Sequence, residues 1–379
     1  MCVFISSITG RCQNIVNIYN AFYRKTNSIR IKKMGIFIIL VLCLIGCDWS
    51  SDENEIKDKE MHFIFSGSYD VIKVPVPDGG IDFPTGINDD NTSRVEKAFY
   101  IGETLVTIAL WDTVSRWAKE REYGYYYGFP TYVTTNPDKI NWDKPITDPT
   151  GIGYNNVWEY HGRMSMYYVT PIWCNAFTEW YNEKHGTNLV PVYQDTYGNA
   201  IRGINNMDNF LETANSNATG FRLPTSEEWE LAARWNGDSD INTVKKMIND
   251  IDFSSQAINF TTGRSASGAA SNVENFGEND LVAVWKNNSG VRLPIKTKKP
   301  NMLGIYDMSG NCLELTGTWN YGRIGSSDWW SAQCRGGSAS SDYEDISIGK
   351  IFLANYNRGS FLFIVETNNV GFRVARNAE

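Results

Sequence analysis

Histidine is scarce in this sequence of 379 residues, which contains only His62, His161 and His185. No two of them have the short spacing with which a pair of histidines on one helix binds a metal ion. No serine stands in the G-x-S-x-G turn of a hydrolase, and no Ser-His-Asp arrangement can be recognised. The composition therefore speaks against a histidine-based metal centre and against a serine hydrolase.

Cysteine is unevenly placed, because none of the seven cysteines follows Cys334. Besides Cys334, the body of the chain contains Cys174 and Cys312. In an exported protein Cys312 and Cys334 could form a disulfide if their strands are neighbours. Single buried thiols are the simpler alternative, and we favour it.

The sequence has no apolar run long enough to span a bilayer as a helix. The run from Ile36 to Ile45 follows Lys32 and Lys33 and has the length of a signal-peptide core. It leads into Gly46 and Cys47, an ending that resembles a bacterial lipobox, in which the cysteine receives the lipid. A signal anchor, or an ordinary signal peptide followed by a chance cysteine, is the alternative.

Three segments follow from this reading of the N-terminus. Residues 1–47 are predicted to be a signal peptide ending in the lipobox, and 48–60 a polar tether rich in Ser, Asp, Glu and Lys. Residues 61–379 are predicted to form one domain. Without residues 1–47, which contain no acidic residue, 29 basic and 43 acidic residues remain, a net charge of −14. Such an acidic body argues against nucleic-acid partners, which are bound mainly through their phosphates.

The domain shows no internal repeat and no linker rich in Pro, Gly or Ser, but it contains three predicted helices. The first places Leu110, Val114 and Trp117 on one buried face, because their spacing is i, i+4, i+7. Between the helices we expect short strands and long irregular connections, because Asn, Gly and Ser are dense at 205–220 and 263–290.

The other two helices are predicted from their capping residues. Thr170 followed by Pro171 is typical of an N-cap and a first helical position, and Gly186 is expected to end this second helix. Thr225 and Glu228 have the spacing of a capping box, which opens the third helix.

Five strings in this order along the chain resemble those of formylglycine-generating-enzyme domains, also called sulfatase-modifying factors. They are TPIWCNAFTEW (170–180), GFRLPTSEEWELAAR (220–234), GIYDMSGNCLELTGTW (304–319), RGGSAS (335–340) and VGFRVAR (370–376). The resemblance covers roughly residues 99–376. It implies an α+β, C-type-lectin-like fold with small antiparallel sheets, two to three helices and extensive irregular loops.

The chain departs from the enzymes of this family at the residues that carry their chemistry. Those enzymes hold copper with a pair of cysteines between the RGGS and final GFR motifs, and here Ser341 stands about where the first would be. Without a thiolate, copper(I) has no soft ligand. The related iron-dependent sulfoxide synthases need clustered histidines, which the chain also lacks. We therefore expect a non-catalytic member that requires no cofactor.

One inherited metal site matches the family pattern, and it would bind calcium in a structural role. The resemblance carries over Asp307, Gly310, Cys312 and Glu314 as ligands through side chains and backbone carbonyls. Hard oxygen ligands around a tight glycine turn suit calcium. The alternative is that Asp307 caps the turn and Glu314 binds buried amides without a metal ion.

Non-catalytic domains with this frame recur as the variable proteins of diversity-generating retroelements, in which reverse transcription mutates adenines in the last stretch of the gene. Residues 335–376 resemble such a cassette, because they are terminal and have drifted from the enzyme pattern between retained motifs. We predict 335–376 as a variable ligand-binding segment. Its candidate contact residues, all encodable from mutated adenine codons, are Ser340, Ser341, Asp342, Tyr343, Asn355, Tyr356, Asn357, Phe361, Leu362, Phe363 and Ile364.

Three apolar stretches near these positions need separate interpretations. Residues 351–354 are predicted to be a core strand and are excluded from the site. Trp329 and Trp330 are second-rank contact candidates, because packing beneath loops is their commoner role. Residues 361–365 read alone as a buried strand, but the parent family has a polar loop at this place, so we expect an exposed apolar patch.

The sequence thus predicts a membrane-anchored bacterial lipoprotein, lipidated at Cys47 and displayed at the outer membrane or cell surface. Its variable segment would bind an unknown macromolecule, which we expect to be a protein, through aromatic and apolar contacts with Ser, Asn and Asp hydrogen bonds. The alternatives are a copper-dependent oxidase of the parent family and an invariant envelope adhesin.

Overall fold

The computed structural model describes residues 68–123, 166–203, 214–324, 327–357 and 370–378, which belong to one compact unit, Met61–Glu379. Cys47 and the predicted signal peptide and tether lie outside these residues. In the described ranges, no helix combines the length and apolarity that crossing a bilayer would require.

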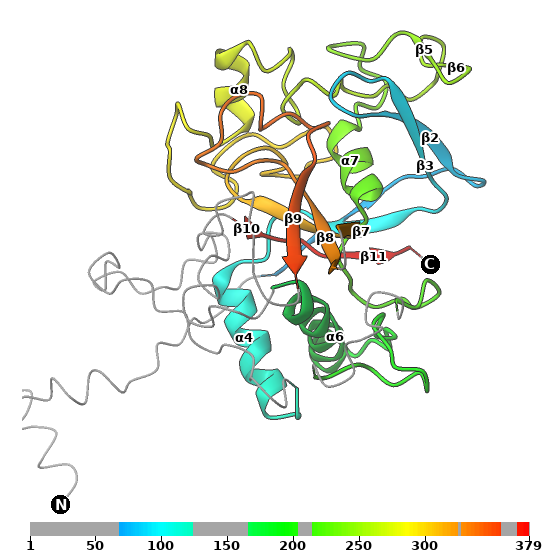
Figure 1. The fold of residues 1–379 in the computed structure, drawn as a ribbon, viewed down its shortest axis with the longest axis vertical. Coiled ribbons are helices and arrows are strands. Elements are labelled where there is room, and N and C mark those ends of the chain that lie inside the picture. Colours follow the sequence, from blue (N-terminus) through cyan, green and yellow to red (C-terminus); the bar gives the residue numbers. More distant parts are fainter. Residues whose placement is uncertain (1–67, 124–165, 204–213, 325–326, 358–369, 379) are drawn as a thin grey trace, which may run out of the picture. The chain divides into compact units, whose positions relative to one another are not determined.

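Two sheets organise the fold (Figure 1). The first has the order β1-β4-β11, all antiparallel, and consists of β1 (Val71–Val74), β4 (Phe99–Gly102) and β11 (Ala375–Asn377). The second has the order β10-β7-β8-β9. Its long pair β7 (Leu313–Ile324) and β8 (Ser327–Arg335) is flanked by β9 (Phe352–Asn357) and by β10 (Val370–Gly371), which runs parallel to β7.

Two short hairpins complete the strands. They are β2 (Ile81–Thr85) with β3 (Asn91–Val95), and β5 (Met247–Ile248) with β6 (Ile251–Asp252). The described residues also contain four helices: α4 (Ile108–Lys119), α6 (Met166–His185), α7 (Ser226–Arg234) and α8 (Phe276–Val282). Small sheets with few helices are what the sequence predicts.

The predicted helices α4 and α7 are confirmed. In α4, Leu110 and Val114 are fully buried, and Thr107 caps the helix by accepting from the Leu110 N–H. In α7 the capping box forms as predicted, with the Thr225 hydroxyl accepting from the Glu228 N–H and the Glu228 carboxylate accepting from the Thr225 N–H.

The predicted start of α6 is wrong, although its end at Gly186 is confirmed. The helix begins at Met166, and Pro171 lies inside it, where it removes a single intrahelical hydrogen bond. The hydroxyl of Thr170 is buried without a hydrogen-bond partner, so it caps nothing. Gly186 adopts a φ of +66°, the left-handed conformation that ends many helices.

The core is formed by three clusters of buried side chains. One joins α4 and α6 to the bases of β7 and β8, with the rings of Trp111 and Trp173 stacked at 5.2 Å. A second joins α7 to the β1-β4-β11 sheet through Trp229 and Phe99, and a third packs α8 against Trp285 and Ile346.

The prediction of a core strand at 351–354 is half wrong. The segment is part of a strand, but β9 is the last strand of its sheet in the described residues. Ile351 and Leu353 are 42% and 39% exposed, and only Phe352 packs partly against the core. An apolar run in a strand at the edge of a sheet is covered less well than the same run at its centre.

Candidate functional site

The segment 335–376 is anchored at both ends by a buried arginine paired with a buried glutamate. At its start, Arg335 Nη2 lies 2.7 Å from Glu230 Oε2, and Arg335 Nε donates to the Ser226 hydroxyl. Near its end, Arg373 Nη2 lies 2.5 Å from Glu314 Oε1, with both side chains fully buried. Helix α7 therefore holds one end of the segment, and strand β7 holds the other.

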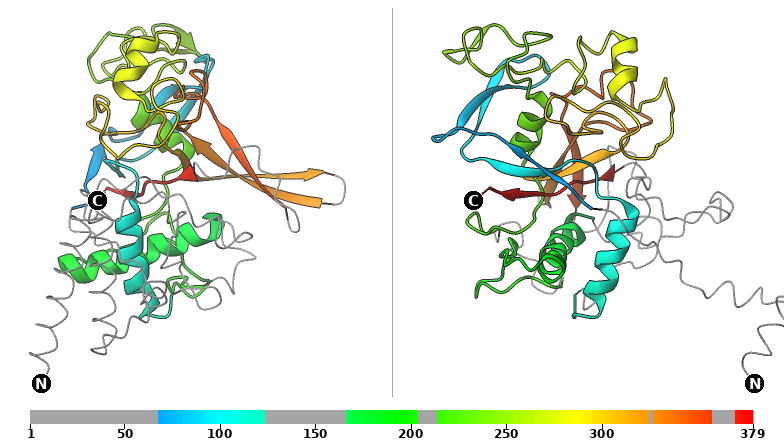
Figure 2. Two further views of the ribbon diagram at one scale, coloured as in Figure 1. Left: turned by 90° about the vertical axis from the view of Figure 1, so that its left-hand side faces the viewer. Right: turned by 180° about the vertical axis from the view of Figure 1, so that it is seen from behind.

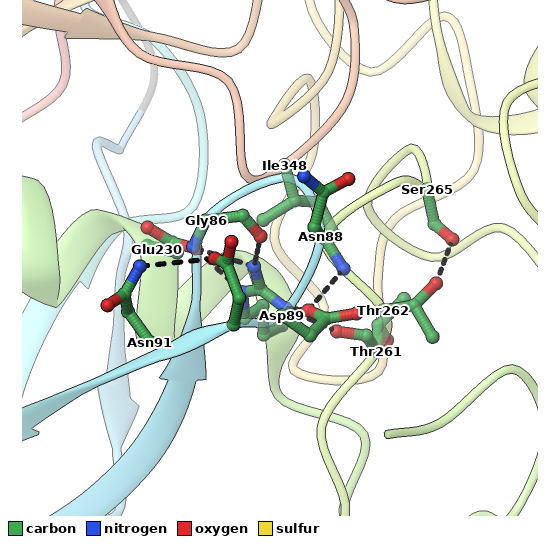
Figure 3. A network of polar contacts seen from close by, with 12 residues as sticks. Gly86, Asn88, Asp89, Asn91, Glu230, Thr261, Thr262, Ser265 and Ile348 are labelled. Carbon is green, nitrogen blue, oxygen red and sulfur yellow. Dashed lines mark hydrogen bonds and ion pairs between the residues drawn. The ribbon is translucent and has the colours of Figure 1, made fainter. Parts of the chain in front are cut away.

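Glu230 also joins α7 to the β2–β3 hairpin through Arg234. The Glu230 Oε1 atom lies 2.7 Å from Arg234 Nη2, and Arg234 Nη1 lies 2.5 Å from Asp89 Oδ1. Figure 3 shows Asp89 and Glu230 side by side with the Gly86 carbonyl, which accepts a further bond from Arg234. Every charged group in this buried network lies beside a group of opposite charge, so α7 holds the Arg335 side chain in a fixed position.

Two glycines turn the chain sharply after Arg335. Gly336 and Gly337 have φ angles of +89° and +70°. A Cβ atom at Gly337 would meet the Asp345 carbonyl oxygen at 2.6 Å, so only glycine fits there. The turn leads into a serine cluster in which the Ser338 N–H donates to the Ser341 hydroxyl at 3.0 Å.

Ser340 to Tyr343, four of the predicted contact residues, pack against the segment that begins at α8. The Lys286 N–H donates to the Ser341 carbonyl, and Lys286 Nζ lies 2.9 Å from Asp342 Oδ1 in a solvent-exposed ion pair. The Tyr343 ring lies 5.5 Å from the ring of Phe276, which is 44% exposed. The structure thus presents these residues at the surface beside an exposed aromatic ring.

Phe276 and Lys286 were not among the predicted contact residues, because α8 was not predicted from the sequence. A local signal was present, since Asn275 stands three residues before Glu278 and its side chain accepts from the Glu278 N–H. The helix has only 7 residues, too few for an apolar periodicity to show.

The second group of predicted contact residues lies at the end of β9. Asn355, Tyr356 and Asn357 pair with Ser331, Trp330 and Trp329 of β8. Trp330 pairs on its other side with Tyr321, so Tyr321, Trp330 and Tyr356 form one cross-strand row. The second-rank candidates Trp329 and Trp330 therefore lie directly beside the first-rank candidates.

The two groups do not form one contiguous site in the described residues. Figure 1 shows the loop before β9 close to α8 and the end of β9 pointing away from it. In the left panel of Figure 2 the far halves of β7 and β8 extend well beyond the loops around α8. The remaining candidates, Phe361, Leu362, Phe363 and Ile364, lie outside the described residues.

The proposed calcium ligands lie close together around the turn that precedes β7. Asp307 is 3% exposed, and the Asn311 side-chain amide and the Lys296 backbone N–H donate to its carboxylate. Burial raises its pKa, and the charge of nearby Glu314 adds to the increase. Glu314 accepts from Arg373 and from the Trp229 indole N–H. Both oxygens of Glu314 therefore have protein donors, and calcium binding at these residues stays a prediction.

In the part of the chain that the structure describes, no group of three or more His, Cys, Asp and Glu side chains is placed to hold a metal ion. Cys174, Cys312 and Cys334 are buried free thiols, so the disulfide alternative does not apply to them. Burial raises the pKa values of Cys312 and Cys334 to about 12. These thiols do not fit copper, which binds cysteine as the thiolate.

Comparison with protein families decides which domain this is. Residues 51–378 match the sulfatase-modifying factor enzyme 1-like domain. The chain belongs to this family. The predicted resemblance and fold class are thereby confirmed, and they agree with the small sheets and few helices of the structure.

Individual relatives match this sulfatase-modifying factor enzyme 1-like chain over a smaller part of its length or at low sequence identity. It is 30% identical over 162 residues to "Chaperone protein LppX" of Paenibacillus barcinonensis, a match that covers 41% of this chain and 52% of that protein. The chain thus spans about half the length of this curated relative.

Two solved structures are similar over most of the chain. CarF is 21% identical with a TM-score of 0.51, covering 82% of this chain and 99% of that one. Treponema denticola variable protein 1 is 21% identical with a TM-score of 0.49, covering 84% and 99%. At this identity the likeness to CarF establishes a shared fold and nothing about activity.

Proposed function

We propose that the chain is a lipid-anchored, non-catalytic receptor of the bacterial surface, whose segment 335–376 binds diverse macromolecular ligands and is diversified by a retroelement. One observation carries the proposal: the residues that anchor segment 335–376 in the fold are different from those that it exposes to solvent. Arg335 and Arg373 are locked in buried ion pairs, while Asp342 between them is exposed to solvent and its neighbours Ser341 and Tyr343 are half-buried.

This separation is what a diversified site needs. Substitutions at exposed positions away from caps, turns and buried partners usually change stability by about 0.5 kcal/mol or less. The buried pairs at the ends of the segment have their partners on α7 and β7, outside the segment itself. The frame can therefore persist while the surface residues change.

The state of the cysteines supports a non-catalytic role. The parent chemistry needs an accessible thiolate, whereas Cys312 and Cys334 are fully buried with raised pKa values. Neither lies between the RGGS and GFR motifs, where the enzymes of the family carry their cysteines.

The ligand would be a protein that binds where Tyr343 lies beside Phe276, and along the end of β9. Exposed aromatic rings beside short polar side chains are the composition of adaptable binding surfaces. The lipid on Cys47, together with the polar tether 48–60, would hold the domain at the membrane. The outer membrane or the cell surface is the expected location.

The decisive experiment is genomic. A near-copy of the last gene segment, beside a reverse-transcriptase gene and differing from it only at adenines, is the expected finding. If the genome has no such copy, diversification is rejected and an invariant adhesin remains. Copper-dependent oxidation of cysteine peptides by the purified protein would reject the non-catalytic role instead.

A further inference from the structure

A hollow of about 380 Å³ lies between the β1-β4-β11 sheet and the loop that follows α6. It is lined by Tyr100 of β4, Arg376 of β11, Tyr181 of α6 and the loop residues Thr187, Asn188 and Leu189. In both panels of Figure 2, α6 lies below β11. None of the residues that line the hollow belongs to the loop beside α8. Its volume falls at the lower end of the range for small-molecule sites.

The cation in this hollow has no acidic partner. The Arg376 guanidinium stacks over the Tyr100 ring, 4.3 Å from its centroid, and its hydrogen bond is a long one, 3.5 Å, to the Asn377 carbonyl. It forms no ion pair with any carboxylate of the described residues, unlike Arg335 and Arg373. An arginine held over an aromatic ring still has a planar fork of donors that can bind a carboxylate.

A second cation strengthens the positive potential at this place. Lys73 of β1 and Arg376 of β11 are both paired in register with Tyr100, one on each side. Directly opposed cross-strand residues have Cβ atoms about 5 Å apart. Lys73 is exposed, and within the described ranges it too forms no ion pair. Two unpaired cations in one row stand out in a body whose net charge is −14 after residue 47.

The remaining polar groups of the hollow can both donate and accept. The hydroxyls of Tyr100 and Tyr181 and the side-chain amide of Asn188 have no hydrogen-bond partner among the described residues. The Thr187 hydroxyl donates to Asn182 Oδ1 at 2.7 Å and keeps its lone pairs. Hydroxyl and amide groups of this kind match ligand hydroxyls, which also donate and accept.

We propose that this hollow, which we call the Arg376 pocket, binds an acidic sugar unit, with its carboxylate on Arg376 and its hydroxyls on Tyr100, Tyr181 and Asn188. One guanidinium lines the hollow, and it balances the single negative charge of a uronic acid. The sugar can be free or the terminal unit of a polysaccharide, since both present the same groups. Arg376 is the last residue of segment 335–376, but none of the predicted contact residues lines the pocket, so the inference does not depend on variation at those positions.

Binding is measured by isothermal titration calorimetry on the full chain with glucuronate, glucose and N-acetylglutamate, and with a glucuronate-terminated oligosaccharide. Glucuronate is expected to bind about tenfold or more tightly than glucose, which lacks the carboxylate, because a charge-assisted hydrogen bond contributes roughly that factor. It is also expected to bind more tightly than N-acetylglutamate, which lacks the hydroxyls. The oligosaccharide arm tells a terminal polysaccharide unit from a free sugar.

Variants assign the binding to this pocket. Arg376→Gln is expected to weaken glucuronate binding about tenfold while leaving glucose unchanged, and Tyr181→Phe, which removes a single hydroxyl, about threefold. Arg94→Gln serves as the matched control, because Arg94 is an exposed arginine paired with Asp82 and Glu96, and it should bind like wild type. Melting temperatures and circular dichroism of each variant exclude misfolding, and Tyr181→Phe and Tyr100→Phe remain informative if Arg376→Gln unfolds.

Three results would overturn the proposal. They are equal affinity for glucuronate and glucose, binding that Arg376→Gln leaves unchanged, and binding of N-acetylglutamate as tight as that of glucuronate. The last result would assign the pocket to acidic peptides. Because the assay involves no residue of 340–357, failure of the receptor hypothesis would leave it unaffected.

Discussion

Arg335 Nη2 and Glu230 Oε2 lie 2.7 Å apart, although 105 residues separate them in the sequence and both side chains are nearly fully buried. Glu230 also neutralises Arg234, so one carboxylate serves two buried guanidinium groups. The junction ties the start of segment 335–376 to α7 and, through Arg234 and Asp89, to the β2–β3 hairpin.

The first prediction concerns this junction. Glu230→Gln leaves two buried arginines short of a counter-charge, and we expect it to lower the free energy of unfolding by about 3–5 kcal/mol. Glu183→Gln is the control, because Glu183 pairs with Arg121 at the solvent-exposed surface and should cost about 1 kcal/mol or less. Urea denaturation of both variants measures the difference. Similar losses in the two variants would show that the buried pair contributes no more than a surface pair.

The junction also illustrates what the sequence could not reveal. The capping box at Thr225 and Glu228 and the end of α6 at Gly186 were predicted correctly, because each depends on residues within a few positions of one another. The pairing of Arg335 with Glu230 depends on the way distant segments meet, which no local spacing encodes. The sequence identifies such residues only through their resemblance to a family.

Two errors have the same physical origin. The pair Thr170 and Pro171 matches the local pattern of a helix start, but α6 begins at Met166 and includes Pro171 despite the cost of a proline inside a helix. Residues 351–354 are apolar enough for a core strand, but β9 occupies an edge of its sheet in the described residues, so Ile351 and Leu353 stay exposed. In both cases the local sequence is compatible with two structures, and contacts with distant parts of the chain determine which one forms.

The second prediction compares the stability cost of substituting an exposed and a buried residue of the same loop. Asp342→Ala removes an exposed ion pair with Lys286 and should change stability by about 0.5 kcal/mol or less. Ile346→Ala, four residues later, empties a fully buried site and should cost about 2–5 kcal/mol. Thermal and chemical denaturation compare the two. A large cost at Asp342 would contradict the view that this position is free to vary.

The third prediction concerns calcium and pH at Asp307. Its pKa is raised by burial, so the folded state holds the proton more tightly than the unfolded chain, whose aspartates titrate near pH 4. Without calcium, this group's contribution is therefore fully present below about pH 4 and is lost as pH rises through the folded-state pKa. Calcium should reverse the loss by neutralising the carboxylate.

The measurement compares the stability of wild type and of Asp307→Asn, each in chelator and in calcium. In chelator at pH 7, Asp307→Asn should be at least as stable as wild type, whereas in calcium the wild type should be the more stable. Asp345→Asn, at an exposed pair with Lys350, should respond to calcium as wild type does. If calcium raises the melting temperature of neither wild type nor control, the hydrogen-bonded alternative for Asp307 and Glu314 is correct.

The fourth prediction tests the alternative that the chain is an oxidase. With pKa values of about 12, Cys312 and Cys334 carry almost no thiolate at pH 7.5, and their burial blocks access. Iodoacetamide should label both at least about 100-fold more slowly in the folded protein than in urea. Mass spectrometry of peptides after digestion reads each cysteine separately. Labelling of Cys312 at the rate of a free thiol would reopen the enzymatic interpretation.

The last prediction concerns Phe361 and Phe363, which lie outside the described residues and are expected to form an exposed apolar patch. If they are exposed, the double substitution Phe361→Ser with Phe363→Ser changes stability by about 1 kcal/mol or less. Phe372→Ser is the buried counterpart, since Phe372 is fully buried against Trp111 and Trp173, and it should cost more than about 3 kcal/mol. A loss of that size in the double variant would show that both rings belong to the core. Residues 361–364 would then no longer be contact candidates, leaving only the residues beside α8 and at the end of β9.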